Sequence, residues 1–299
     1  MYHFLFDSMT KGNCGQQKSS GKKQFANPYD QIKHELSSII APSQLSVLPK
    51  KWEKIGDVLI LKLPVRLQDK EIIAEVYGQV LNCRTVMEDV GGISGVKRQP
   101  DLSFLYGDVN TETVHLENGI NFKLDVSKIM FSSGNIDERI RMATISSPDE
   151  TVVDFFSGIG YFTIPMAVYC SPHIFACELN PIAYKYLLEN IKLNHVENQV
   201  TCLLGDCREV APHHVADRIV MGYFESYDFL PYALKVLKRK GGIIHYHELC
   251  PTKLLSHYPL ERFDTVASDY HRNVEIIHYH TIKSYNPRFS HVVIDIHFF

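Results

Sequence analysis

The most constraining feature of the sequence is a glycine-containing loop between an expected strand and an expected helix. Residues 151–156 form an apolar run that predicts a buried strand, and residues 161–169 predict a helix. The loop that joins them, residues 154–160, reads DFFSGIG. Glycines in such a loop allow a tight turn and let the backbone approach a ligand closely. The unit is typical of a parallel sheet with helices packed on its faces.

The alternation of strands and helices continues to the end of the chain. The further expected strands are 173–179, 200–204, 217–223 and 242–247, and the further expected helices are 181–194 and 228–238. Residues 264–278 and 291–298 have strong β character and should form a final antiparallel pair, with the last strand between two neighbours. The pattern predicts an α/β fold whose Rossmann-like domain spans residues 146–299.

Residues 30–145 predict a smaller α+β domain. Its expected helices are 30–40, 71–81 and a linker helix at 134–144, and its expected strands are 113–115, 120–124 and 128–131. Asn118-Gly119 predicts a hairpin turn, because both residues tolerate a positive φ. Residues 11–23 are polar and rich in Gly, Ser and Lys, so residues 1–29 are expected to be a disordered tail.

Composition excludes several classes of protein. The chain is 45% hydrophobic and 22% charged with a net charge of -3, which is ordinary for a soluble protein and does not indicate a nucleic-acid partner by itself. No apolar run approaches the roughly 18 residues that span a bilayer. We therefore expect a cytoplasmic protein. The 7 cysteines form no C-x-x-C pair, which disfavours a disulfide framework and zinc, and we predict no metal site.

Polar residues follow three consecutive expected strands. The loop at 154–160 is a poor dinucleotide site, because Thr163 stands where the third glycine of G-x-G-x-x-G would be. It fits instead the D-x-[FG]-x-G-x-G loop that wraps the amino-acid end of S-adenosylmethionine (SAM). Glu178, at the end of the next strand, is placed to bind ribose hydroxyls, with a solvated carboxylate as the alternative. Asp206 could accept a hydrogen bond from adenine or cap the following helix, and the sequence favours neither.

These positions together predict a SAM site at the carboxyl edge of the sheet. The end of the fourth strand, Gly222-Tyr223-Phe224, belongs to the same edge. In amino-methyltransferases that act on nucleic-acid bases this place carries N-P-P-Y or a relative, whereas Gly222 offers no side-chain hydrogen bond and leaves room. The predicted cofactor-binding residues are Asp154, Phe156, Ser157, Gly158, Gly160, Glu178, Leu179, Asn180, Asp206, Cys207, Gly222 and Tyr223.

Over about residues 50–299 the chain resembles a known family of tRNA-modifying enzymes. The segments that carry the resemblance are 105–107, 113–119, 125–132, 135–141, 154–160, 180–181, 189–194, 217–223 and 244–248. They are similar to the tRNA (guanine-N1)-methyltransferases that modify the base 3′ of the anticodon, and to their paralogue in wybutosine synthesis. Three features resemble the paralogue: Gly222-Tyr223-Phe224 in place of Asn-Leu-Pro, Met130 in place of Tyr, and His245-Tyr246-His247.

The resemblance implies a specific reaction. The paralogue transfers the 3-amino-3-carboxypropyl group of SAM to a tricyclic guanosine derivative next to the anticodon of tRNA(Phe), and releases methylthioadenosine. Glu138 matches the family's proton acceptor, and Arg139 and Arg98 match positions near the substrate or the transition state. The resemblance therefore implies that Glu138, Arg139 and Arg98 are the catalytic residues. The residues alone would instead favour a solvated helix face for Glu138 and Arg139. Gly222 would make room for the methionine arm to turn its γ-carbon toward the base.

Other functions are consistent with parts of the pattern. A tRNA (guanine-N1)-methyltransferase at the same position is disfavoured by the missing Asn and Pro at 222–224. A catalytically dead SAM- and RNA-binding protein is disfavoured by the intact cofactor residues, and a small-molecule methyltransferase leaves the first domain unexplained. We expect a monomer that binds the tRNA(Phe) anticodon loop and no membrane. The basic residues expected to contact RNA are Lys97, Arg98, Arg139, Arg141, Lys238, Arg239, Lys240 and Lys283.

Overall fold

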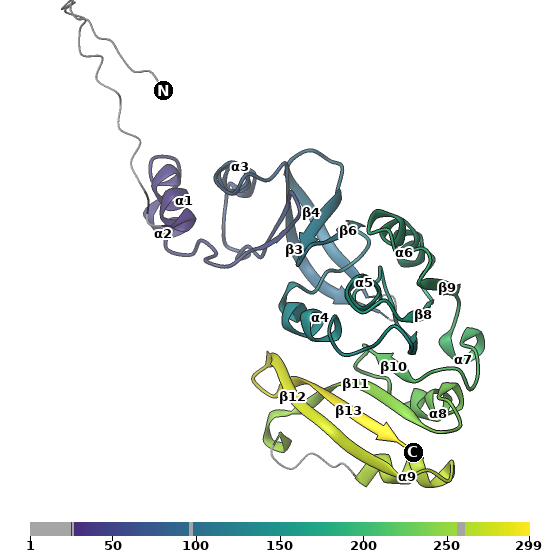
Figure 1. The fold of residues 1–299 in the computed structure, drawn as a ribbon. Helices are drawn as coiled ribbons and strands as arrows, with labels where there is room; N and C mark the ends of the chain where they lie inside the picture. The colour runs from purple at the N-terminus through teal and green to yellow at the C-terminus, as the bar shows by residue number, and fades with distance from the viewer. Residues whose placement is uncertain (1–24, 26, 96–97, 256–260) are drawn as a thin grey trace, which may run out of the picture.

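The computed structural model describes residues 25, 27–95, 98–255 and 261–299. The disordered tail predicted for residues 1–29 therefore lies almost wholly outside the described residues. Figure 1 shows a small amino-terminal sheet joined to a larger sheet that carries helices on both faces.

The larger sheet has seven strands in the order β12-β13-β11-β10-β7-β8-β9. The strands are β7 (Thr151–Asp154), β8 (His173–Glu178), β9 (Val200–Leu204), β10 (Arg218–Met221), β11 (Gly242–Pro251), β12 (Val274–Asn286) and β13 (Phe289–Phe298). The first five run parallel, and β13 lies antiparallel between β11 and β12. The predicted α/β class and the central place of the last strand are both confirmed.

Helices cover both faces of this sheet because side chains alternate along each strand. Val152 and Val220 pack on one face with α4 (Ile136–Met142), α5 (Thr163–Tyr169) and α6 (Pro181–Leu193). Val153 and Ile219 pack on the other face. The helices on that face are α7 (Cys207–Val210), α8 (Leu230–Val236) and α9 (Glu261–Asp269). Short 3-10 turns are η1 (Ser133–Asn135), η2 (Tyr227–Phe229) and η3 (Thr252–Leu254).

The strand predicted over residues 264–278 is wrong in its first half. Residues 261–269 form α9 instead, and β12 begins only at Val274. Phe263, Val266 and Ala267 are all buried, and their spacing places them on one face of a helix that packs on the sheet. The β-forming character of the segment is thus outweighed by tertiary burial.

The strand predicted at residues 128–131 is absent from the described chain, because the chain turns after β6. The Asp125 carboxylate accepts hydrogen bonds from the backbone N–H and the hydroxyl of Ser127, at 3.0 Å and 2.7 Å. The Lys128 N–H donates to the Asp125 carbonyl at 3.0 Å. Ile129 and Phe131 are buried against the hairpin core rather than paired in a sheet.

The amino-terminal part contains a sheet that the sequence did not indicate. Its strands, in the order β1-β2-β3-β4, are β1 (Glu53–Ile55), β2 (Val58–Leu61), β3 (Thr85–Ser94) and β4 (Gln99–Gly107). The helices beside it are α1 (Pro28–Leu36), α2 (Pro42–Leu45) and α3 (Lys70–Leu81). The sheet and helices share a core of their own that includes Ile32, Leu59 and Tyr77.

The predicted hairpin joins this part to the larger sheet. β5 (Glu112–Glu117) and β6 (Ile120–Asp125) meet at Asn118 and Gly119, whose φ angles are 48° and 73°, so the predicted turn is confirmed. Asn190 of α6 accepts a hydrogen bond from the Lys123 N–H at 2.6 Å, and Asn194 accepts one from the Asn121 N–H at 2.9 Å. The hairpin is therefore docked on α6. The domain division at 145/146 stays a prediction.

Candidate functional site

The loop at residues 154–160 is built around a buried carboxylic acid. Asp154 is 0% exposed and accepts hydrogen bonds from the Thr163 hydroxyl at 2.8 Å and the Phe156 N–H at 3.3 Å. Burial raises the pKa of Asp154 to about 7 against those hydrogen bonds. Gly158 and Gly160 have φ angles of +57° and +100°, which side chains rarely adopt, so the turn needs glycine at both positions.

Glu178 links this loop to the next one. Its carboxylate accepts a hydrogen bond from the Gly158 N–H at 2.7 Å and another from the Asn180 N–H at 2.6 Å. Burial raises its pKa even though both N–H groups favour the charged form. Asn180 caps α6 through the Ile182 N–H at 3.0 Å, and Leu179 between them is 50% exposed. Ser157, also buried, donates its hydroxyl to the Cys177 carbonyl at 3.0 Å.

Asp206 caps α7 in this structure, which is one of its two expected roles. Its Oδ1 accepts from the Arg208 N–H at 2.9 Å, and its Oδ2 pairs with the Arg208 guanidinium at 2.5 Å. These hydrogen bonds lower the pKa of Asp206 against a smaller effect of burial. Cys207 is buried at 4% exposure. A contact with adenine stays a prediction for both residues.

Gly222 makes space for an aromatic ring of the protein. A Cβ atom at Gly222 would lie 2.9 Å from Cε2 of Phe162, at the start of α5. The Phe162 ring in turn lies 5.2 Å from the His247 ring. The Tyr223 ring lies 5.5 Å from the ring of Phe156, which belongs to the loop at residues 154–160.

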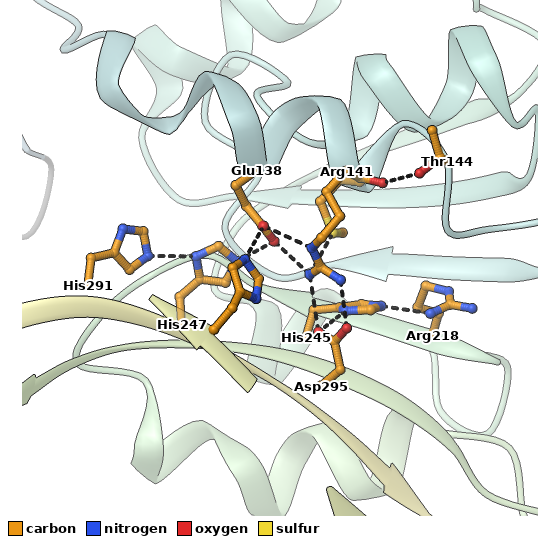
Figure 2. Close-up of polar contacts among 10 residues, drawn as sticks. Glu138, Arg141, Thr144, Arg218, His245, His247, His291 and Asp295 are labelled. Atoms are coloured by element: carbon orange, nitrogen blue, oxygen red, sulfur yellow. Dashed lines mark hydrogen bonds and ion pairs between the residues drawn. The ribbon is translucent and has the colours of Figure 1, made fainter. Parts of the chain in front are cut away.

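Glu138 is buried among polar side chains on the α4 face of the sheet (Figure 2). Its carboxylate pairs with Arg141 at 2.7 Å and contacts His280 Nε2 at 3.0 Å and His247 Nε2 at 3.9 Å. The Glu138 side chain is 0% exposed, so the solvated helix face favoured by the residues alone is wrong. His247 contacts His291 at 3.0 Å through ring nitrogens. The cluster thus spans α4, β11, β12 and β13.

Buried charge pairs continue this network along the sheet. Arg141 also pairs with Asp295 at 2.7 Å, and Asp295 Oδ1 lies 2.5 Å from His245 Nδ1. His245 Nε2 in turn lies 2.8 Å from Arg218. Burial opposes ionisation of Asp295, but the hydrogen bonds from His245 and Arg141 outweigh it and hold its pKa well below the usual range.

Burial favours the neutral form of His245, His247 and His291. Burial lowers the pKa of His291 to about 3, and it moves the pKa of His247 well below its ordinary value. Burial also lowers the pKa of His245, against the opposing effect of Asp295. Neutral imidazoles can therefore line the space beside Glu138 without repelling its cationic partner.

Arg139 points away from this cluster. Its guanidinium makes a two-pronged ion pair with Glu117, at 2.5 Å and 2.7 Å, and donates to the Ser132 carbonyl at 2.9 Å. It also lies 4.9 Å from the Phe131 ring centroid. Burial alone would raise the pKa of Glu117. The hydrogen bonds from His115 and Arg139 outweigh burial and lower this pKa to about 2. The arginine ties α4 to β5, and its predicted catalytic role stays a prediction.

Arg98 reaches the carboxyl edge from the amino-terminal sheet. It follows β3 with a φ of +53°, and its guanidinium lies 5.9 Å over the ring of Phe224. Lys283 is near the same edge, where it donates to the Ser132 hydroxyl at 3.0 Å. Lys238 and Lys240 instead pair with Asp217 at the opposite edge of the sheet. Lys97 lies outside the described residues.

The sequence missed the residues that surround Glu138. They are Arg141 as an internal ion-pair partner, His280, His291 and Asp295. The available signal was polar residues within apolar strand sequence, such as Asp295 in HVVIDIHFF. Within the described ranges no group of three or more His, Cys, Asp or Glu side chains has a metal-binding arrangement, and the six described cysteines are free. No described helix is long and apolar enough to cross a bilayer.

The chain matches two family models. The TRM5/TYW2 methyltransferase domain model matches residues 113–277, and the TYW2 N-terminal domain model matches residues 32–111. A curated relative from Pyrococcus horikoshii, named tRNA(Phe) (4-demethylwyosine(37)-C(7)) aminocarboxypropyltransferase, is 45% identical over 270 residues. The match covers 90% of this chain and 96% of the relative.

The solved structures that are similar to this one include two of TYW2 proteins. The crystal structure of P. horikoshii TYW2 in complex with MeSAdo has a TM-score of 0.82 at 43% identity, covering 91% of this chain and 99% of that one. The crystal structure of M. jannaschii TYW2 in complex with AdoMet has a TM-score of 0.66 at 41% identity, covering 83% of this chain and 99% of that one.

Proposed function

The chain belongs to the TRM5/TYW2 family, and from that premise we propose that it transfers the 3-amino-3-carboxypropyl group of SAM to C7 of the tricyclic guanosine precursor of wybutosine in tRNA(Phe). The acceptor base lies next to the anticodon, and methylthioadenosine is released. The observation that carries the proposal is the set of cofactor loops at one sheet edge, in a chain 45% identical to an aminocarboxypropyltransferase. Action as a monomer stays a prediction.

The residues at the edge suit a SAM molecule. Gly158 and Gly160 expose backbone where any side chain would collide with Tyr161 or Ile164, so the loop can lie close to the amino-acid end of the donor. Glu178, already held by two N–H groups, keeps lone pairs for ribose hydroxyls, and exposed Leu179 offers an apolar face for adenine. When bound, SAM supplies a sulfonium whose γ-carbon is electrophilic and whose leaving group is a neutral thioether.

Glu138 is the proposed acceptor for the proton that the base carbon loses. The new bond joins C7 to the γ-carbon, the bond between the γ-carbon and sulfur breaks with its electrons on sulfur, and the C7 proton must leave. Phe162 lies next to Gly222, and the His247 ring lies next to Phe162. Glu138 contacts His247, so a row of side chains connects Gly222 to Glu138. Arg141, His280 and His247 orient its carboxylate in a dry setting.

Arg139 and Arg98 have different proposed roles. Arg139 positions Glu138 by holding α4 against Glu117 of β5. Arg98 stands at the open edge and is the cation that would meet RNA there. The tRNA (guanine-N1)-methyltransferase remains the alternative, because it shares the fold and the donor. Gly222 in place of Asn and the match to the TYW2 N-terminal domain model both favour the aminocarboxypropyl reaction.

A double-label assay tests which group moves. SAM carries one isotope in the methyl group and another in the carboxyl carbon, and the full chain reacts with tRNA(Phe) that contains the tricyclic precursor. We expect the carboxyl label in RNA and the methyl label in the released nucleoside. The methyl label in RNA would establish the methyltransferase instead. A Glu178→Ala variant serves as the donor-binding control, and it should lose both signals.

A further inference from the structure

The tripeptide at the end of β10 divides the edge into two sides. Tyr223 lies with Phe156 on the side of the cofactor loops. The Phe224 ring lies on the other side, 4.7 Å from the His291 ring and 6.0 Å from the Tyr285 ring. In the proposed reaction, SAM and the acceptor base must meet at the end of β10. Because SAM would lie on the Tyr223 side, the Phe224 side is left for the acceptor base.

Two segments that are distant in sequence meet at Phe224. Arg98 comes from the link between β3 and β4, and its guanidinium lies 5.9 Å from the centroid of the Phe224 ring. Tyr285 comes from the end of β12 and is 50% exposed. Arg98 has no ion pair with any carboxylate among the described residues. A cation and two partly exposed aromatic rings therefore lie together.

This combination suits a planar aromatic ligand with a nearby phosphate. Unpaired RNA bases stack on aromatic rings and on guanidinium planes, and every base offers a π-face for such contact. A tricyclic base has a larger face than guanine. His291, which contacts Phe224, is connected through His247 to Glu138, so two imidazoles link a base held at Phe224 to the buried carboxylate.

We propose that Phe224, with Arg98 over its ring and Tyr285 beside it, is the stacking platform for the acceptor base. The proposal rests on the proposed function, because it takes the tricyclic base as the ligand. Its consequence is that the base must leave the anticodon-loop stack to be seated there.

The test compares two anticodon stem-loop RNAs that bind the full chain without SAM. One carries the tricyclic base, and the other is abasic at the same position. For the natural sequence we expect the abasic RNA to bind roughly 10- to 100-fold more weakly, which is the usual value of one stacked base. Phe224→Leu should bring the two affinities together, while Phe224→Trp should keep them apart.

Phe299→Leu is the matched control, because Phe299 is 49% exposed but lies at the opposite edge, beyond the pairing of Phe298 with Gly242. It should leave both affinities unchanged. If Phe224→Leu also weakens binding of the abasic RNA, Tyr285→Leu takes its place in the comparison.

The outcomes distinguish failure of the stacking proposal from failure of the proposed transfer reaction. A natural chain that does not distinguish the two RNAs, or a Phe224→Leu variant that still does, overturns the platform whatever the transfer assay gives. Loss of discrimination in Phe224→Leu supports the platform even if no aminocarboxypropyl group is transferred, in which case only the proposed function fails.

Discussion

Two buried aspartates in this fold have opposite electrostatic surroundings. Asp154 has neutral partners, so burial raises its pKa to about 7. Asp295 is also buried, but it has Arg141 and His245 as partners, and its pKa is lowered. The charged form is therefore stabilised only where a cation or an imidazole faces the carboxylate. Each aspartate makes stability depend on pH in a different direction.

Asp154 should destabilise the ligand-free fold as pH rises. Its pKa is higher in the fold than the ordinary value of 3.8, so its contribution is complete below pH 4 and is lost as pH rises through about 7. Relative to Asp154→Asn, the unfolding free energy of the natural chain should fall by about 4 kcal/mol over this range. Denaturant unfolding at several pH values measures the difference, and a difference independent of pH would contradict the assignment.

Gly222→Ala should disturb the ring behind the edge. The added Cβ atom would lie 2.9 Å from Cε2 of Phe162, which packs between Gly222 and His247. We expect a loss of about 1–3 kcal/mol in the free energy of unfolding, as for other overpacked sites. The double variant Gly222→Ala with Phe162→Leu should recover part of that loss. A Gly222→Ala variant as stable as the natural chain would show that glycine is not needed there for packing.

At the scale of elements, α4 is fixed by ion pairs on both of its sides. Arg139 pairs with Glu117 of the hairpin, and Arg141 pairs with Asp295 of β13. Arg139 is buried and Arg141 is half-buried, and a charge removed from water is costly unless it is paired. The two ion pairs attach α4 to β5 and to β13, which are far apart in sequence, and they fix the position of Glu138 on α4.

Arg139→Met should destabilise the protein by about 3–5 kcal/mol, because it leaves the Glu117 carboxylate buried without its cation. Arg139→Met with Glu117→Gln should be less destabilised than Arg139→Met alone. Thermal and denaturant unfolding measure both variants. In the double variant, recovered transfer activity would identify Arg139 as a positioning residue. Recovered stability without activity would instead support its sequence-predicted catalytic role.

Some elements could be predicted from sequence and others could not. The later strands are apolar runs bounded by clear turn residues, so their alternation with helices was readable. β3 and β4 were missed because Gly91, Gly92 and Pro100 are poor strand formers. The surroundings of Glu138 were missed because its partners come from distant strands, with His280 lying 142 residues away. Pairing of that kind follows from topology rather than from local pattern.

At the scale of the whole molecule, a chain with a net charge of -3 is proposed to bind RNA. Attraction between phosphates and basic residues is local, because it is screened beyond about 10 Å. Arg98 and Lys283 lie near the carboxyl edge of the sheet, whereas Lys238 and Lys240 lie at the opposite edge. The RNA should therefore approach where the two sheets meet.

The most direct test uses two preparations of tRNA(Phe), one with unmodified guanosine next to the anticodon and one with the tricyclic precursor. Each is incubated with the full chain and SAM, and mass spectrometry identifies the digested nucleosides and the spent donor. We predict that only the tricyclic nucleoside gains an aminocarboxypropyl group, with release of methylthioadenosine. A methyl group on guanosine, with release of S-adenosylhomocysteine, would contradict the account.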